Sequence, residues 1–181
     1  PEILHLCRMM HAEMGRGRFD VDRVRQQLAM AFDRKGGILS VIGAPGHIRA
    51  IQLLMITREW YTTDEHIEDL INWVHPEHRR SDYGRLLIAH AKQCSEQLSA
   101  SAGYKIPLFM GVLTNKRMAA KVHLYRRFFG MPHGALFVYN AAWVNKDDLC
   151  EDDIWRMPSI VNAFFKREAR KEHRDKARVR A

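Results

Sequence analysis

The stretch "INWVHPEHRRSDYGRLLIAH", residues 71–90, places a β-rich run before a proline and a helical pattern after it. Proline cannot donate to a sheet ladder and biases the preceding residue toward an extended conformation, so Pro76 must end the strand. From Leu86 to Leu98, apolar residues recur at the spacing of one helix face. A strand followed this closely by a helix favours a fold in which helices cover a sheet.

The rest of the chain has the same two kinds of pattern. The predicted elements are helices over 3–14 and 21–32, strands over 38–43, 49–60 and 65–75, a helix over 86–98, a strand over 106–113, a helix over 118–129, a strand over 135–144 and a helix from 160 into the tail. The continuous apolar run at 106–113 predicts a strand covered on both faces. This order predicts a mixed α/β fold, with a central mixed β-sheet flanked by helices.

Composition excludes several classes of protein. Hydrophobic residues at 46% and charged residues at 28% argue against general disorder. The longest apolar runs, such as "LLMI" at 53–56, are far shorter than the roughly 20 residues that cross a bilayer. The first residues are broken by charges and lack a signal-peptide pattern, so we expect a cytoplasmic protein with no membrane association.

No metal site is assigned from the sequence. Cys7, Cys94 and Cys150 are isolated and have no CxxC spacing, which indicates small core residues rather than ligands. His75 and His78 lie three apart, but they flank a proline in an expected loop. No third ligand stands at a recognisable spacing from them.

The net charge of +8 is concentrated at the C-terminus. Residues 166–181 contain eight Lys or Arg and three acids, a net charge of +5, which leaves +3 for the other residues. Helical spacing would align Arg170, Arg174 and Arg178, whose like charges repel. Either a nucleic acid or acidic protein partner relieves that repulsion, or the segment is a frayed, solvated terminus. We therefore divide the chain into a domain over 1–145 and a helical extension with a basic tail over 146–181.

The turn after Pro76 has the properties of an anion site. The first four amides of a helix are unpaired, and the helix dipole adds about half a positive charge there. Arg79, Arg80 and Arg85 would add three full charges, and Gly84 would let a ligand approach the backbone. A phosphate or pyrophosphate is the expected ligand. An exposed, charged turn that binds nothing is the alternative.

Two motifs resemble those of the GNAT family of N-acetyltransferases, which use acetyl coenzyme A. The first is "WVHPEHRRSDYGRLLI", similar to the family's "VxPxxR" and (Q/R)xxGx(G/A) patterns, with Val74, Pro76, Arg79 and Gly84 in matching positions. Asp82 stands where the family has its first glycine. The second is "LFMGVLTNKRMAAKVHLYRRFFGM", residues 108–131, similar to "NxxAxxxYxxxGF". The resemblance covers roughly residues 1–145.

The resemblance implies a coenzyme site at the first motif. The backbone of Trp73 and Val74 would pair with the pantetheine arm, where the central strand and the strand at 106–113 splay apart. The residues implied at the pyrophosphate are Arg79, Arg80, Ser81, Asp82, Tyr83, Gly84 and Arg85. Asn115 would contact the pantetheine, or it could equally cap its own helix. A carboxylate at position 82 would repel a pyrophosphate unless it turns away, to cap the helix or to pair with Arg79 or Arg85.

The resemblance also implies catalytic candidates. Tyr125 stands where the family often places a general acid for the coenzyme's sulfur, although a buried tyrosine on an apolar stripe can also be a core residue. Glu68 aligns with a glutamate that some members use as the base. An ordinary solvated strand carboxylate is the alternative for Glu68. In a regular strand, Asp69 would point to the opposite face, so one of the two should face the cleft.

The implied function is transfer of acetyl from acetyl coenzyme A to a primary amine, by direct attack in a ternary complex. An alternative follows from Asp82 and the basic tail: an inactive domain of this fold that is structural or associated with nucleic acid. Members of the family often pair, so a homodimer is also implied. The family builds its acceptor pocket from the first helices and the last strands, and these do not reveal the acceptor.

Overall fold

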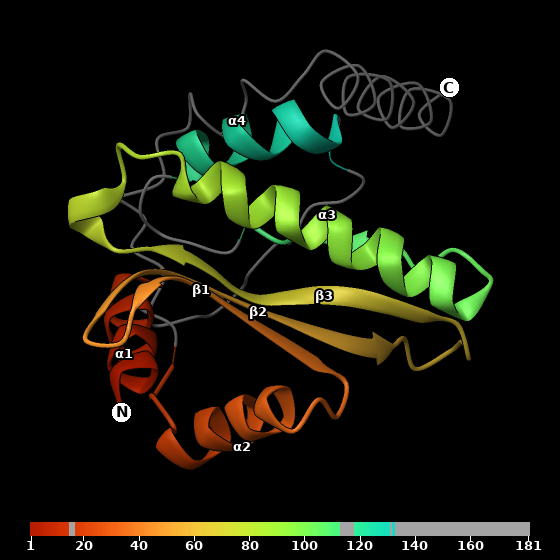
Figure 1. The fold of residues 1–181 in the computed structure, drawn as a ribbon, viewed down its shortest axis with the longest axis horizontal. Helices are drawn as coiled ribbons and strands as arrows, with labels where there is room; N and C mark the ends of the chain where they lie inside the picture. The colour runs from red at the N-terminus through yellow and green to blue at the C-terminus, as the bar shows by residue number, and fades with distance from the viewer. Residues whose placement is uncertain (15–16, 113–117, 131, 133–181) are drawn as a thin grey trace, which may run out of the picture. The chain divides into compact units, whose positions relative to one another are not determined.

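A computed structural model of the chain describes residues 1–14, 17–112, 118–130 and 132 (Figure 1). Four strands form one sheet in the order β1-β2-β3-β4, with β1, β2 and β3 antiparallel and β4 parallel to β3. The elements are α1 (Glu2–Met14), α2 (Val21–Phe32), β1 (Gly37–Ala44), β2 (His47–Arg58), β3 (Glu65–Val74), the 3-10 turn η1 (Pro76–His78), α3 (Tyr83–Ala102), β4 (Leu108–Phe109) and α4 (Met118–Phe129). The predicted mixed sheet flanked by helices is confirmed.

Helices α1 and α2 cover one face of the sheet (Figure 1). Asp20 caps α2, as predicted, because its carboxylate accepts from the amides of Asp22 and Arg23 at 3.0 Å. The apolar stripes of both helices pack on alternate residues of the strands. This core contains Leu6, Cys7, Leu28, Ala31, Ile51, Leu53, Met55, Ile71 and Trp73. Burial of these side chains is the main force that holds the first two helices on the sheet.

Helices α3 and α4 lie on the other face of the sheet (Figure 1). Helix α3 buries a stripe against the intervening strand residues, in a core of Leu54, Ile67, Ala91, Cys94 and Ile106. It ends at Gly103, whose φ of 77° is the left-handed conformation typical of a helix C-cap. The sheet therefore has two apolar faces, and alternate residues of β2 contact one or the other.

The strand at 106–113 is much shorter than predicted. Within the described part of this segment, residues 106–112, only Leu108 and Phe109 pair with β3, and Phe109 is 48% exposed, so the expectation of a strand buried on both faces was wrong. The ladder does not continue because the amide of Gly111 donates to the side chain of Asp69 instead of to a neighbouring strand. The cause is thus a competing side-chain acceptor, which an apolar pattern does not reveal.

Some predictions fall outside the described residues. The strand at 135–144, the helix from 160, the boundary at 145 and the basic tail over 166–181 stay predictions. None of the helices in the described part of the chain has the length and apolar character needed to cross a bilayer.

Candidate active site

A β-bulge in β3 sets the geometry of the site. Leu53 of β2 pairs with Ile71 and Leu54 pairs with Asp69, so Leu70 has no partner in β2. An extra residue shifts the alternation of side chains by one position. Asp69 and Asn72 consequently lie on the same face of the sheet, the face that α3 and α4 cover.

Tyr125 of α4 meets these two side chains. Its side chain is 6% exposed, and its hydroxyl oxygen accepts from Asn72 Nδ2 at 2.9 Å. The same hydroxyl donates to Asp69 Oδ2 at 3.4 Å, while Asp69 Oδ1 accepts from the amide of Gly111 at 2.6 Å. The hydroxyl of Tyr125 is therefore buried and oriented by two partners, and the Asp69 carboxylate holds β4 and α4 to the central strand.

Burial dominates the ionisation of this cluster. It raises the pKa of Asp69 to about 6, although the amide of Gly111, the charge of Lys121 and the hydroxyl of Tyr125 act to lower it. Burial, followed by the charge of Asp69, raises the pKa of Tyr125, and burial lowers the pKa of Lys121. A carboxylate with a pKa near neutrality beside a tyrosine that stays protonated is suited to exchanging protons.

Beyond β4, the backbone of β3 has an open edge. The amide of His75 donates to the carbonyl of Arg49 in β2 at 2.8 Å, so the backbone N–H of His75 faces β2. Alternate residues direct their N–H and C=O groups to opposite edges, so Trp73 also faces β2, while Asn72 and Val74 face away from it. Among the described residues, pairing of β3 with β4 stops at Glu68 and Phe109. Val74, rather than Trp73, therefore offers its N–H to a ligand, while its carbonyl accepts from Arg79 Nε at 3.3 Å.

The N-terminus of α3 lies next to this edge. A Cβ on Gly84 would be 4.0 Å from Val74 Cγ2 and 3.4 Å from Leu124 Cδ2, so α3 starts close against β3 and α4. The hydroxyl of Ser81 accepts from the amide of Tyr83 at 3.3 Å. In the part of the chain that the structure describes, the amides of Gly84 and Arg85 have no hydrogen-bond partner. These two amides are available to an anion.

The charge of Asp82 is paired with Arg85. Its carboxylate makes no capping hydrogen bond, and Oδ1 lies 3.3 Å from Arg85 Nη1. Of the orientations expected for this side chain, pairing with Arg85 is the one observed. Within the described ranges, Arg80 makes no ion pair and is exposed. Besides the Asp82–Arg85 pair, the turn therefore has the positive charge of Arg80 and the free helix amides to offer an anion.

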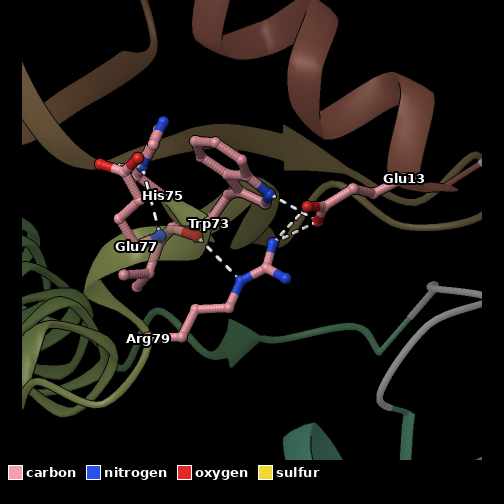
Figure 2. Close-up of polar contacts among 6 residues, drawn as sticks. Glu13, Trp73, His75, Glu77 and Arg79 are labelled. Atoms are coloured by element: carbon pink, nitrogen blue, oxygen red, sulfur yellow. Dashed lines mark hydrogen bonds and ion pairs between the residues drawn. The ribbon is translucent and has the colours of Figure 1, made fainter.

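Arg79 lies in a contact with α1 that the sequence did not suggest. Figure 2 shows Glu13 beside both Arg79 and Trp73. Arg79 Nη2 lies 2.5 Å from each carboxylate oxygen of Glu13, and Trp73 Nε1 donates to the same carboxylate at 3.0 Å. Arg79 Nε also donates to the carbonyl of Val74 at 3.3 Å. The charge of Arg79 is compensated, and its side chain fixes the end of β3.

A pocket of about 270 Å³ lies on the opposite face of the sheet, between α1, α2 and β3. Its apolar wall includes Leu53, Leu70 and Ile71. Its polar lining residues are His11, Arg18, Asp20, Arg23 and Gln27. Leu70 is the bulged residue next to Asp69. The pocket and the Tyr125 cluster therefore lie on opposite faces of the sheet at the same position along β3.

His75, Glu77 and His78 form a group whose potential ligand atoms lie within 4.8 Å of one another. The sequence shows no third ligand at a recognisable spacing from the two histidines, and the turn η1 supplies one in Glu77. His75 Nδ1 accepts from the amide of Glu77 at 3.4 Å (Figure 2), so one of its nitrogens already has a donor.

The fold is similar to that of solved structures, acetyltransferases among them. A GCN5-related N-acetyltransferase from Ralstonia eutropha JMP134 has 20% identity and a TM-score of 0.54, over 76% of this chain and 92% of that chain. An integron cassette protein from the mobile metagenome of Cole Harbour Salt Marsh has 15% identity and a TM-score of 0.53, over 78% and 84%. An aminoglycoside acetyltransferase from an uncultured soil metagenomic sample has 16% identity and a TM-score of 0.50, over 81% and 90%. This chain has the GNAT fold. No protein-family model and no curated protein matches its sequence.

Within the GNAT fold, some of the predicted site residues lie together and others lie apart. Gly84 lies against Val74 at the open edge of β3, and Tyr125 meets the same strand at Asn72, while the Arg85 side chain pairs with Asp82. Glu68 is exposed and pairs with Met55, which packs in the core under α1 and α2, so it lies on the face opposite to Tyr125. The predicted opposition of Glu68 and Asp69 holds. Asn115 lies outside the described residues.

Sequence reasoning missed two residues of the site. Asn72 is a polar residue between the buried Ile71 and Trp73, and a polar residue in such a strand requires a hydrogen-bond partner. Glu13 is an acid in the last turn of α1, where the helix dipole disfavours negative charge. Each is a local signal that the side chain has a partner elsewhere in the fold.

Proposed function

We propose that this protein is an N-acetyltransferase that moves acetyl from acetyl coenzyme A to a primary amine, by direct attack in a ternary complex. One observation carries the proposal. Two groups lie along the open edge of β3. The Tyr125 hydroxyl is 2.9 Å from Asn72 Nδ2, and the first turn of α3 lies against Val74. A ligand with a thioester at one end, amides along its arm and a pyrophosphate at the other matches this order of groups.

The residues present fit the coenzyme. The amides of Gly84 and Arg85, with Arg80 beside them, would hold the pyrophosphate. The backbone groups of Asn72 and the N–H of Val74 would pair with the amides of the pantetheine arm as an added strand. Arg79 and Trp73 would act indirectly, because both are held by Glu13. Ser81 and Tyr83 shape the turn, and Asn115 is proposed to contact the pantetheine.

The chain's own groups can handle the protons of the reaction. An attacking amine must lose a proton, and the departing sulfur must gain one. The Tyr125 hydroxyl is proposed to donate to the sulfur, since it is protonated at neutral pH and fixed beside the open edge. A carboxylate on each face of β3, Glu68 and Asp69, is a candidate to take up the amine's proton.

The acceptor is proposed to bind in the pocket between α1 and α2. Its apolar wall ends at the bulged Leu70, on the face of the sheet that Glu68 shares and that lies opposite to Asp69. Arg18 and Arg23 line this pocket and are exposed. Two cations disfavour a polycationic acceptor such as an aminoglycoside, and they favour a primary amine that also carries an anionic group.

The test is calorimetric titration of the whole protein with acetyl coenzyme A, followed by release of free thiol in the presence of a panel of amines. Binding at micromolar concentrations and amine-dependent thiol release are expected. Arg80→Ala should weaken binding, while Arg25→Ala on the far side of α2 should leave it unchanged. No heat at millimolar acetyl coenzyme A would contradict the proposal and favour a domain of this fold that is not an enzyme.

A further inference from the structure

The turn η1, between β3 and α3, carries three side chains that can bind a metal ion. His75, Glu77 and His78 come from four consecutive residues, and their potential ligand atoms lie within 4.8 Å of one another. His75 is the N-cap of η1, and side chains at i and i+3 of a 3-10 helix lie one above the other, so the two imidazoles are on the same side of the turn. Their ring centroids are 5.9 Å apart. Figure 2 shows the Glu77 carboxylate beside the His75 ring.

The spacing of these ligand atoms is close to what one ion requires. His75 Nδ1 lies 3.9 Å from Glu77 Oε2. Two ligand atoms of a tetrahedral zinc ion, each about 2.0–2.1 Å from the metal, are about 3.3 Å apart. The side chain of Glu77 is 80% exposed, so nothing around it prevents its rotation, whereas that of His75 is 23% exposed and is held in place. Side-chain movements of about 0.5–1.5 Å would therefore bring the three ligand atoms onto one ion.

His75 already has the protonation that metal binding needs. A ligating nitrogen must carry no proton, and Nδ1 of His75 carries none because it accepts from the amide of Glu77. That hydrogen bond is 3.4 Å long, against about 2.7–3.2 Å for an ordinary N–H donor. An ion at Nδ1 would replace a weak contact, and the amide of the exposed Glu77 can turn to water instead.

The backbone of the turn is fixed before any ion binds. The amide of His78 donates to the carbonyl of His75 at 2.9 Å, and the carbonyl of His78 accepts from both the amide and the hydroxyl of Ser81, at 3.0 and 2.6 Å. The ion pair of Arg79 with Glu13 ties the end of the turn to α1. Ligands on a fixed backbone need little reorganisation to bind an ion.

The charges around the turn set the strength of binding. Arg79 does not oppose a cation, because its charge is compensated in the ion pair with α1 (Figure 2). Arg80 is exposed and makes no ion pair among the described residues. Arg49 donates to the hydroxyl of Tyr83 at 2.9 Å, and the Tyr83 ring is close to the cluster. Since these two arginines oppose a cation, micromolar rather than nanomolar binding is expected.

We propose that His75, Glu77 and His78 bind a divalent transition-metal ion of the zinc class. Two imidazole nitrogens and one carboxylate suit such ions, whereas Mg²⁺ and Ca²⁺ prefer sites made of oxygen. Three ligands leave the fourth position of a tetrahedral ion to water or another ligand. The bound ion joins the two ends of η1 and stabilises the turn from which α3 starts. The site goes beyond the proposed acetyl transfer and does not depend on it.

The first test is calorimetric titration of the full-length protein, stripped with a chelator, with zinc chloride. One site with a micromolar Kd is expected, and magnesium chloride should give no heat. Glu77→Gln and His78→Ala should each weaken zinc binding about tenfold or more. His5→Ala, at an exposed histidine of α1, is the control and should leave the affinity unchanged. Absence of zinc binding at millimolar concentration, or binding that both Glu77→Gln and His78→Ala leave unchanged, would overturn the proposal.

The second test identifies the ligands directly. In protein labelled with ¹⁵N at histidine, one equivalent of zinc should move the ring nitrogen signals of His75 and His78 and leave those of His5 in place. Signals of His75 and His78 that stay in place, or movement of one without the other, would contradict a shared ion. Zinc binding without binding of acetyl coenzyme A would disprove the proposed function alone, and acetylation by a protein that binds no zinc would disprove this site alone.

Discussion

Arg79 Nη2 lies 2.5 Å from both carboxylate oxygens of Glu13, which joins the loop after β3 to the last turn of α1 (Figure 2). The two side chains are only 23% and 24% exposed, so the pair is shielded from water. Since Trp73 also donates to Glu13, the contact positions both the indole and the guanidinium. The arginine that the first motif assigns to a phosphate is, in this chain, part of the framework that holds the strand end.

Loss of either partner should therefore destabilise the fold. Glu13→Gln and Arg79→Gln are each expected to lower the free energy of unfolding by about 1–3 kcal/mol, because a shielded charge is left without its partner. The double variant should cost less than the sum of the two. Urea unfolding measures the free energy of unfolding of the two single variants and the double variant. Arg58→Gln serves as the control, since Arg58 is 59% exposed in its pair with Glu65, and a smaller change is expected there. Strict additivity would show that the pair contributes nothing.

Removal of the charge at position 82 should strengthen coenzyme binding. Asp82→Asn removes a negative charge from the first turn of α3 and releases Arg85, so an affinity gain of about two- to fivefold for coenzyme A is expected at low salt. Asp22→Asn is a matched control: Asp22 and Arg25 form the same i,i+3 pair on α2, at 3.4 Å against 3.3 Å. Calorimetry at two salt concentrations measures the change. An unchanged affinity would place the pyrophosphate away from this turn.

Replacement of Tyr125 by Phe should affect the chemical step more than binding. We expect kcat to fall about 10- to 100-fold with KM for acetyl coenzyme A nearly constant, because the variant loses a proton donor but keeps the aromatic packing. Stability should fall by about 1 kcal/mol, since Asn72 Nδ2 loses its acceptor. Steady-state kinetics measures kcat and KM, and thermal unfolding measures the change in stability. Tyr104→Phe, at a tyrosine that is 50% exposed, is the control and should change neither.

The ionisation of Asp69 should make stability depend on pH. Folding raises its pKa from 3.8 to about 6, so the folded state binds the proton more tightly and stability falls as pH rises from about 4 to about 6. A shift of this size corresponds to about 3 kcal/mol. Asp69→Asn should therefore be more stable than the wild type by about 1–3 kcal/mol at pH 8, with the difference vanishing below pH 4. Urea unfolding at several pH values measures it, and a constant difference between the two proteins would argue against buried ionisation.

Local patterns predicted most of the elements because helix and strand periodicity are properties of neighbouring residues. Asp20 caps α2 and Pro76 follows the end of β3, as their residue types require. The apolar stripe of α4 placed Tyr125 in the core. The same reasoning failed for the strand at 106–113, where the Asp69 carboxylate competes for the amide of Gly111.

The candidate site was predicted less completely. The sequence by itself determined that a strand ends at a proline, that a helix with cationic residues follows, and that a tyrosine lies on a buried helix face. Only the tertiary structure decided which side chains meet. The bulge at Leu70 arises from the register between β2 and β3, and it brings Asp69, Asn72 and Tyr125 together. Glu13 and Arg79 meet across 66 positions of sequence. Register and long-range ion pairs depend on how whole elements pack, and no local pattern of residues contains that information.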